Sequence, residues 1–376
     1  MPIETEKASS NEPVRYAALD SWRFLAALGV VAYHYESHFS SIAAAPSHRL
    51  FMFGYFVDFF FVLSGFVLMH TYGAKVTNFT AYRDFMRRRL ARVYPLHAAV
   101  TLVFGAVAIY LAVAGVRMRD ASTMDPALIA PHLALIHAWG FGWQPGLNFP
   151  SWSISAELFV YLLFPLFAIL LTRAGVAATF AAALLFAIVM ELVRSSLGMR
   201  SFTDATWDFG MLRAVPTFMA GMALQRLVMS LPRLALPWWI AHAFMALVIA
   251  LLFMQANIYL VLVSFVAAVG VLAITERGGR RTFLQHRYCV MLGDASYAVY
   301  LLHTMFQVAT LMLARKLGFT QWPELIALAL AGTVIIVTVS IFCYRWFEAP
   351  ARRLLSRPFI RGNKLTGVAP TVRANP

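Results

Sequence analysis

The sequence predicts an all-α fold, a polytopic helical membrane bundle of about ten transmembrane helices with both termini in the cytoplasm. Hydrophobic residues make up 61% of the 376 residues and charged residues only 13%, too few charges for a water-facing surface. Apolar runs long enough to cross a bilayer recur along the chain, and Lys and Arg gather between alternate runs. These features exclude soluble, disordered, collagen-like and nucleic-acid-binding proteins.

A membrane-crossing helix needs about 20 mostly apolar residues. In chain order we expect about ten such spans, at residues 17–37, 51–72, 93–115, 152–171, 175–195, 209–225, 236–254, 257–274, 291–313 and 325–346. The stretch 116–151 holds a shorter apolar piece, about residues 126–140, which contains proline and histidines. Its length and composition favour a re-entrant or interfacial segment over a further span.

The basic residues predict how the spans are oriented. If the N-terminus is cytoplasmic, Lys and Arg in the inner segments outnumber those in the outer segments by roughly three to one. The net charge of +14 is therefore explained by topology and anionic lipid head groups. We expect a cytoplasmic segment at 1–16, a transmembrane domain at 17–350 and a basic, disordered tail at 351–376.

Two cysteines, Cys289 and Cys343, lie far apart, which excludes a disulfide framework and a cysteine-based metal cluster. We expect no metal cofactor. We also expect no cleavable signal peptide, because residues 1–14 are polar and the first apolar run carries Asp20 and Arg23 near its start.

Charged residues inside spans are costly and mark functional sites unless they have a structural partner. Arg23 and His34 are three helical turns apart in the first span, on one face and about 16 Å apart along the axis. His34 is either a packing histidine or a general base, and the shared face with a buried arginine favours the base. Asp58 in the second span requires a cationic or hydrogen-bond-donating partner, for which Arg or His on another span are the candidates. The Ser64-Gly65 pair on the same span suits a close helix contact.

Arg89 and Arg92 lie on one face at the start of the third span, just before Pro95. Two guanidinium groups so placed can hold phosphate in a bidentate manner. Glu157, about two turns into the fourth span from its outer end, is expected at the depth of His34, where a carboxylate would orient the imidazole. The alternative is a structural pair between Glu157 and Arg213.

The ninth span carries a polar stripe that favours a helix contact over a second catalytic base, formed by Ser296, Tyr300 and His303. With the other polar residues, this stripe resembles the acyltransferase-3 family of integral membrane O-acyltransferases. The resemblance runs over nearly the whole chain. It rests on six features in order: Arg23 with His34, the FFFVLSGF run after Asp58, Arg89 and Arg92 with Pro95, PSWSISAELFVYLLFP with Glu157, SYAVYLLH ending at His303, and FEAPARR with Glu348 and Pro350.

The resemblance implies transfer of an acyl group, usually acetyl from acetyl-CoA, to a hydroxyl of a carbohydrate or lipid-linked glycan at the bacterial inner membrane. It assigns His34 as the catalytic residue, Arg23 as its supporting cation, Glu157 as a further active-site acid, and Arg89 and Arg92 to the acyl-CoA site. Asp58, Arg213, Tyr300 and His303 are supporting residues. We do not expect the soluble esterase-like domain that some relatives carry. Acceptor selectivity is expected in 116–151, which holds His132, His137 and Trp139.

A different class of function remains open at this point. Intramembrane Arg, Asp, Glu and His also form the proton relays of secondary transporters for sugars or acylated compounds. Inverted repeats and paired broken helices, which such transporters share, are not visible. The identity of the acceptor, the acyl length, the oligomeric state and whether His34 acts as base or carries the acyl group also remain open.

Overall fold

The computed structural model describes residues 15–43, 49–115, 124–144 and 146–357, and these residues form helices, turns and loops without a β-strand. The predicted segments 1–16 and 351–376 therefore fall largely outside the described residues. The helices are α1 (Ala17–Phe39), η1 (Phe51–Tyr55), α2 (Phe56–Tyr72), α3 (Phe79–Val113), α4 (Ile129–Leu133), α5 (Trp152–Ser196), α6 (Gly210–Ser230), α7 (Trp238–Phe253), α8 (Ile258–Arg277), α9 (Arg287–Leu317), α10 (Trp322–Cys343) and α11 (Ala349–Leu355).

Six helical stretches among the described residues are long and apolar enough to cross a membrane, namely Phe51–Tyr72, Phe79–Val113, Phe149–Ser196, Ile258–Arg277, Arg287–Leu317 and Trp322–Leu355. α7 is apolar but has only 16 residues. α1 contains Arg23, and α6 contains Arg213 and Arg226. The protein is thus a polytopic helical membrane protein, as predicted, and each predicted span coincides with a helix or with part of one.

One boundary differs from those predicted. α3 begins at Phe79 rather than near residue 93, because the Asn78 side chain caps it by accepting a hydrogen bond from the Ala81 amide at 2.9 Å. The predicted spans 152–171 and 175–195 both lie in α5, whose helical geometry is interrupted at their junction by Gly175, with φ 86° and ψ 179°. In 124–144, only short helical turns such as α4 form, so this part of 116–151 is not a span, in agreement with the prediction.

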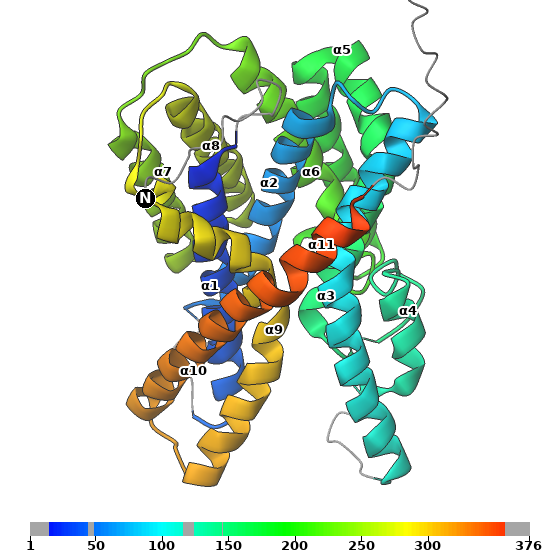
Figure 1. Cartoon of the computed structure of the whole chain (residues 1–376), viewed down its shortest axis with the longest axis vertical. Helices are drawn as coiled ribbons and strands as arrows, with labels where there is room; N and C mark the ends of the chain where they lie inside the picture. Colours follow the sequence, from blue (N-terminus) through cyan, green and yellow to red (C-terminus); the bar gives the residue numbers. More distant parts are fainter. Residues whose placement is uncertain (1–14, 44–48, 116–123, 145, 358–376) are drawn as a thin grey trace, which may run out of the picture.

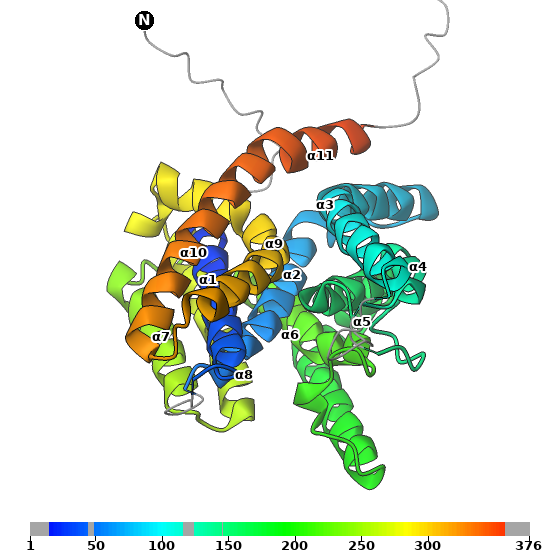
Figure 2. The same ribbon diagram turned by 90° about the horizontal axis from the view of Figure 1, so that it is seen from below.

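The central helices pack in pairs, α1 on α9 and α2 on α6, while α5 covers α6 and α10 covers α9 (Figure 1). Figure 2 shows α7 and α8 on one side of the bundle and α3 and α4 on the other, with α1, α2 and α9 between them. After α10, a π-helical turn at Tyr344–Glu348 leads into α11, which crosses to contact α3.

The contact between α2 and α6 is close because glycines lie on both sides of it. A Cβ atom on Gly65 would lie 2.0 Å from the carbonyl oxygen of Phe218, and one on Gly221 would lie 2.1 Å from that of Val62. This confirms the close helix contact predicted for Gly65. It also holds the polar residues of α2 in a fixed position between α6 and the centre of the bundle.

Candidate active site

Two neighbouring cavities contain most of the polar residues that the sequence singled out. The inner cavity, of about 260 Å³, is lined by α1, α2, α3, α5 and α9. The outer cavity, of about 480 Å³, is lined by α1, η1, α2, α6, α9, the start of α5 with Phe149 and Pro150 just before it, and the segment between α5 and α6. Tyr300 and Val57 line both cavities, so the two share a wall.

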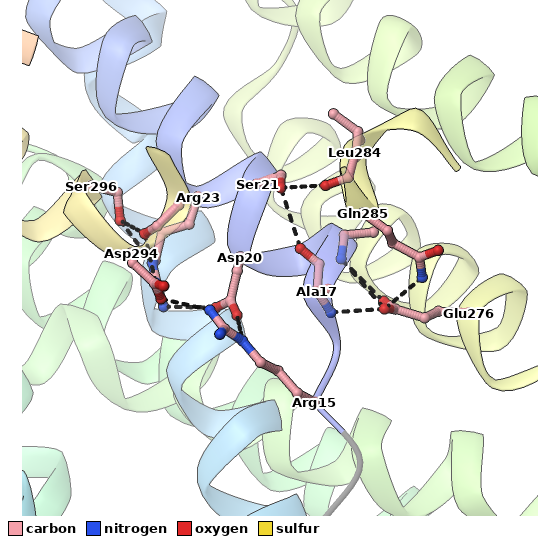
Figure 3. A network of polar contacts seen from close by, with 12 residues as sticks. Arg15, Ala17, Asp20, Ser21, Arg23, Glu276, Leu284, Gln285, Asp294 and Ser296 are labelled. Atoms are coloured by element: carbon pink, nitrogen blue, oxygen red, sulfur yellow. Dashed lines mark hydrogen bonds and ion pairs between the residues drawn. The ribbon is translucent and has the colours of Figure 1, made fainter. Parts of the chain in front are cut away.

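Arg23 reaches the inner cavity from the first turns of α1. Its Nε donates to Ser296 Oγ at 2.8 Å and its Nη2 to the Gly293 carbonyl at 2.8 Å (Figure 3). The Asp20 carboxylate oxygen Oδ1 lies 3.3 Å from Arg23 Nη1. The guanidinium is therefore held by residues of both α1 and α9, and Arg23 lines the inner cavity.

Arg89 and Arg92 enter the same cavity from α3. Arg89 Nη2 donates to the Tyr72 hydroxyl at 3.1 Å, and its guanidinium carbon lies 5.1 Å from the centre of the Tyr72 ring. Arg89 Nε is buried without a hydrogen-bond partner, and Arg92 forms no hydrogen bond to the described residues. The predicted arginine pair is thus brought together with Arg23, and three guanidinium groups surround one space suited to phosphate or another anion.

Glu157 lies in the inner cavity and not, as predicted, beside His34. It accepts a hydrogen bond from Ser64 Oγ at 2.7 Å and one from the Tyr161 hydroxyl. The alternative structural pair with Arg213 is also wrong, because Arg213 binds Asp58. Glu157 is therefore the carboxylate of the arginine-rich cavity.

Asp58 and Arg213 form a buried, bidentate pair between α2 and α6. Arg213 Nη2 and Nε donate to the two Asp58 oxygens at 2.6 and 3.1 Å. The arginine also lies 5.2 Å from the ring centres of Tyr55 and Trp152. The prediction that Asp58 has a cationic partner on another helix is confirmed, and the pair forms part of the outer cavity through Arg213.

His34 lines the outer cavity and forms no hydrogen bond with the described residues. Its ring is surrounded by other rings, with centre-to-centre distances of 4.7 Å to Tyr33, 5.1 Å to His303 and 6.1 Å to Phe149. An imidazole that is open to a cavity and free of structural hydrogen bonds has a nitrogen available for a ligand hydroxyl.

The polar stripe of α9 runs from one cavity to the other. Ser296 accepts from Arg23, and the Tyr300 hydroxyl lies 2.9 Å from Ser153 Oγ and donates to the Pro150 carbonyl at 3.0 Å. His303 packs against His34. The predicted helix contact is present, and within it Ser296 lines the inner cavity while Tyr300 lines both cavities.

The outer cavity also contains residues that the sequence analysis did not single out. They lie between α5 and α6 and comprise Met199, Arg200, Asp204, Thr206, Trp207 and Asp208. Asp204 accepts a hydrogen bond from the Tyr55 hydroxyl at 2.6 Å. By contrast, His132, His137 and Trp139 of the predicted selectivity segment line neither cavity. The available signal was the density of aspartate, arginine and tryptophan in a loop between two apolar runs.

Comparison with known proteins identifies the family of the chain. Residues 16–345 match the family model Acyl_transf_3, described as an acyltransferase domain. The chain is 29% identical over 381 residues to "Acyltransferase MdmB" of Streptomyces mycarofaciens, an alignment covering 92% of this chain and 93% of that protein. It is 33% identical over 163 residues to "Protein 2 in picA locus" of Rhizobium radiobacter, covering 40% of this chain and 82% of that protein. No solved structure shows significant similarity. The resemblance stated from the motifs is confirmed, and the chain belongs to the acyltransferase-3 family of membrane acyltransferases.

Proposed function

We propose that this membrane acyltransferase moves an acetyl group from cytosolic acetyl-CoA to a hydroxyl of a carbohydrate, such as an exopolysaccharide, an O-antigen or another cell-surface glycan. The observation that carries the proposal is the pair of adjacent cavities, one with three guanidinium groups and the other with an unbonded imidazole. A donor rich in phosphate suits the first, and a hydroxyl that must lose a proton suits the second.

In this proposal the chain has ten spans in a bacterial inner membrane, both termini are cytoplasmic, and residues 17–350 form the acyltransferase domain. Acetyl-CoA enters the inner cavity from the cytosol and its phosphates bind Arg89 and Arg92. Arg23 lines the same cavity, as do Tyr300 and Val57 of the shared wall. The thioester reaches that wall, and the acceptor hydroxyl approaches it from the outer cavity.

His34 acts as the general base. The hydroxyl oxygen forms a bond to the thioester carbonyl carbon while His34 accepts the hydroxyl proton, and the carbon–sulfur bond breaks to release the CoA thiolate. Overall the proton lost by the acceptor is gained by the CoA thiol, so no other reactant is needed. In this proposal Glu157, which lines the inner cavity, is the further active-site acid on the donor side.

The test compares cells with and without this protein by mass spectrometry of their surface glycans, together with membranes given isotope-labelled acetyl-CoA. We expect label in O-acetyl groups of a glycan with the wild type and loss of that label with His34→Ala. Uptake of an intact solute into proteoliposomes without covalent transfer would instead support a transporter. Undiminished glycan acetylation by His34→Ala would remove His34 from the mechanism.

A further inference from the structure

His303 is a fully buried histidine with one nitrogen that has no partner. Its exposed fraction is 0%, and it lies on the stripe of α9 that faces His34. Its Nδ1 lies 2.5 Å from the Tyr300 carbonyl oxygen, whereas no hydrogen-bond partner among the described residues reaches its Nε2. A buried polar atom without a partner is costly, and it commonly marks a site where a partner binds or moves during function.

The contact with Tyr300 determines the tautomer of His303. A carbonyl oxygen only accepts, so Nδ1 must carry the proton. In the neutral ring Nε2 is then an acceptor, buried and in need of an N–H donor. The centre of the His34 ring lies 5.1 Å from the centre of the His303 ring, at an interplanar angle of 41°. His34 forms no hydrogen bond with the described residues. One imidazole therefore has an unused acceptor beside another imidazole with an unused donor.

We propose that His303 is the positioning residue of His34, a neutral counterpart of the carboxylate that usually orients a catalytic imidazole. This inference rests on the proposed function. When an acceptor hydroxyl binds one nitrogen of His34, the N–H at the other nitrogen donates to His303 Nε2. The hydroxyl then meets the nitrogen with the free lone pair, and the positive charge formed on proton transfer is shared with the second ring.

The surroundings explain why an imidazole takes this place. Glu157 lies in the inner cavity and Asp58 is bound to Arg213. The two aspartates that line the outer cavity are engaged elsewhere, Asp204 with the Tyr55 hydroxyl and Asp208 with Arg194. A carboxylate beside His34 would add an unpaired charge to a site within the membrane, whereas a neutral imidazole supplies the acceptor without that cost. The chain Tyr300 carbonyl, His303, His34 thus runs from the backbone of α9 to the outer cavity.

The first measurement needs neither donor nor acceptor. Diethylpyrocarbonate modifies the free lone pair of a neutral imidazole, and His34 is reached from the outer cavity while His303 is fully buried. We compare the rate of His34 modification by mass spectrometry in the wild type, His303→Leu, His303→Met and His303→Gln. Leu and Met fill the space without an acceptor, and the flexible Met is an alternative if Leu prevents insertion. Gln restores an acceptor near the Nε2 position.

We expect His34 to react several-fold more slowly in the Leu and Met variants and at nearly the wild-type rate in His303→Gln. In glycan acetylation, the Leu and Met variants should lose on the order of 100-fold in rate at saturating acetyl-CoA, with an unchanged KM for acetyl-CoA. The matched control is His242→Leu on α7, a histidine that also has an unpartnered Nε2 but lines neither cavity.

Equal His34 reactivity in all four proteins would overturn the pairing, even if glycan acetylation is observed. The same reactivity differences in a protein that acetylates no glycan would retain the pairing and refute the proposed function. A merely structural role for His303 predicts that Gln, Leu and Met lower yield and rate alike, without the recovery by Gln.

Discussion

At the residue scale, the charge and shape of the guanidinium groups in the inner cavity lead to a prediction about the donor. Arg89→Lys and Arg92→Lys keep the positive charge but lose bidentate binding. We expect each variant to insert normally and to raise the KM for acetyl-CoA about tenfold, roughly the loss of one charge-assisted hydrogen bond. The measurement is initial rate against acetyl-CoA concentration in membranes with matched protein content.

Arg88→Lys is the control for this series. Arg88 lies on the same helix but outside the cavity, where its Nε is 2.8 Å from an Asp84 oxygen. Its substitution should leave the KM unchanged. An unchanged KM in Arg89→Lys and Arg92→Lys as well would argue against the donor assignment, and a fall in rate with all three would indicate a general loss of folding.

Single residues were predictable where a strong electrostatic requirement acts on them. A buried Asp58 needs a cation, and the structure supplies Arg213. Glu157 was misplaced because counting residues along a helix gives depth only to within about one turn, or 5.4 Å. That turn decides which cavity a side chain enters. The hydrogen bond from Ser64 to Glu157 depends on the packing of α2 against α5, whereas Tyr161, which also donates to Glu157, lies one turn further along α5 itself.

At the element scale, the crossing of α2 and α6 depends on two glycines. Gly65→Ala and Gly221→Ala would each place a methyl group about 2 Å from a backbone carbonyl of the other helix, which cannot rotate away. We expect each substitution to lower the free energy of unfolding by about 1–3 kcal/mol or more. Thermal or SDS-induced unfolding of the purified protein in detergent checks this.

Gly105→Ala is the matched control on α3. Its methyl group would meet only the end of the Ile129 side chain, at 2.9 Å, and this side chain can change rotamer. A loss of stability for Gly105→Ala as large as that for Gly65→Ala would contradict the role assigned to the α2–α6 crossing.

Beside α4, stacked imidazoles lead to a second prediction at this scale. The ring centres of His132 and His137 are 3.9 Å apart. Burial lowers the pKa of His137, and the neighbouring His132 and His97 lower it further. Burial likewise lowers the pKa of His132. Both are therefore neutral when folded, whereas the unfolded chain takes up protons below about pH 6.5.

The contribution of these two histidines to the free energy of unfolding is thus fully present above about pH 6.5. It is lost as the pH falls towards their depressed folded pKa values, by up to ~1.4 kcal/mol per pH unit for each histidine. Unfolding measured from pH 7.5 to 5 should show this decline, and His137→Gln should flatten it. The exposed His286 serves as the control, since His286→Gln should retain the full slope. Equal slopes in all three proteins would exclude the buried pair as the cause.

At the scale of the whole molecule, hydropathy predicted which parts of the chain form membrane helices, because burial in lipid acts on composition alone. It did not predict that α3 would start at Phe79, where a local Asn78 cap extends the helix through a charged stretch. It also did not predict the outer cavity wall between α5 and α6. Residues such as Asp204 and Trp207 belong to a loop rich in aspartate, arginine and tryptophan, but only the fold brings that loop to the cavity that His34 lines.

The arrangement of two cavities separated by a shared wall leads to a prediction about the complete reaction. Val57 is 4% exposed and lines both cavities, so Val57→Trp would add bulk at the shared wall, where the proposed function brings the thioester to the hydroxyl. Because Val57 is not one of the proposed phosphate ligands, Arg89 and Arg92, we expect acetyl-CoA to bind with nearly unchanged affinity. Glycan acetylation should nevertheless fall on the order of 100-fold, since the reacting groups no longer meet.

Calorimetric titration with acetyl-CoA and the rate of glycan acetylation measure the two quantities separately. Val107→Trp on α3 controls for the added indole, because the Val107 side chain is 44% exposed and lines neither cavity. Loss of binding together with rate would mean that the donor itself occupies the wall. Full activity of Val57→Trp would mean that the acyl group does not cross between these cavities, and the division of donor and acceptor between them would have to be abandoned.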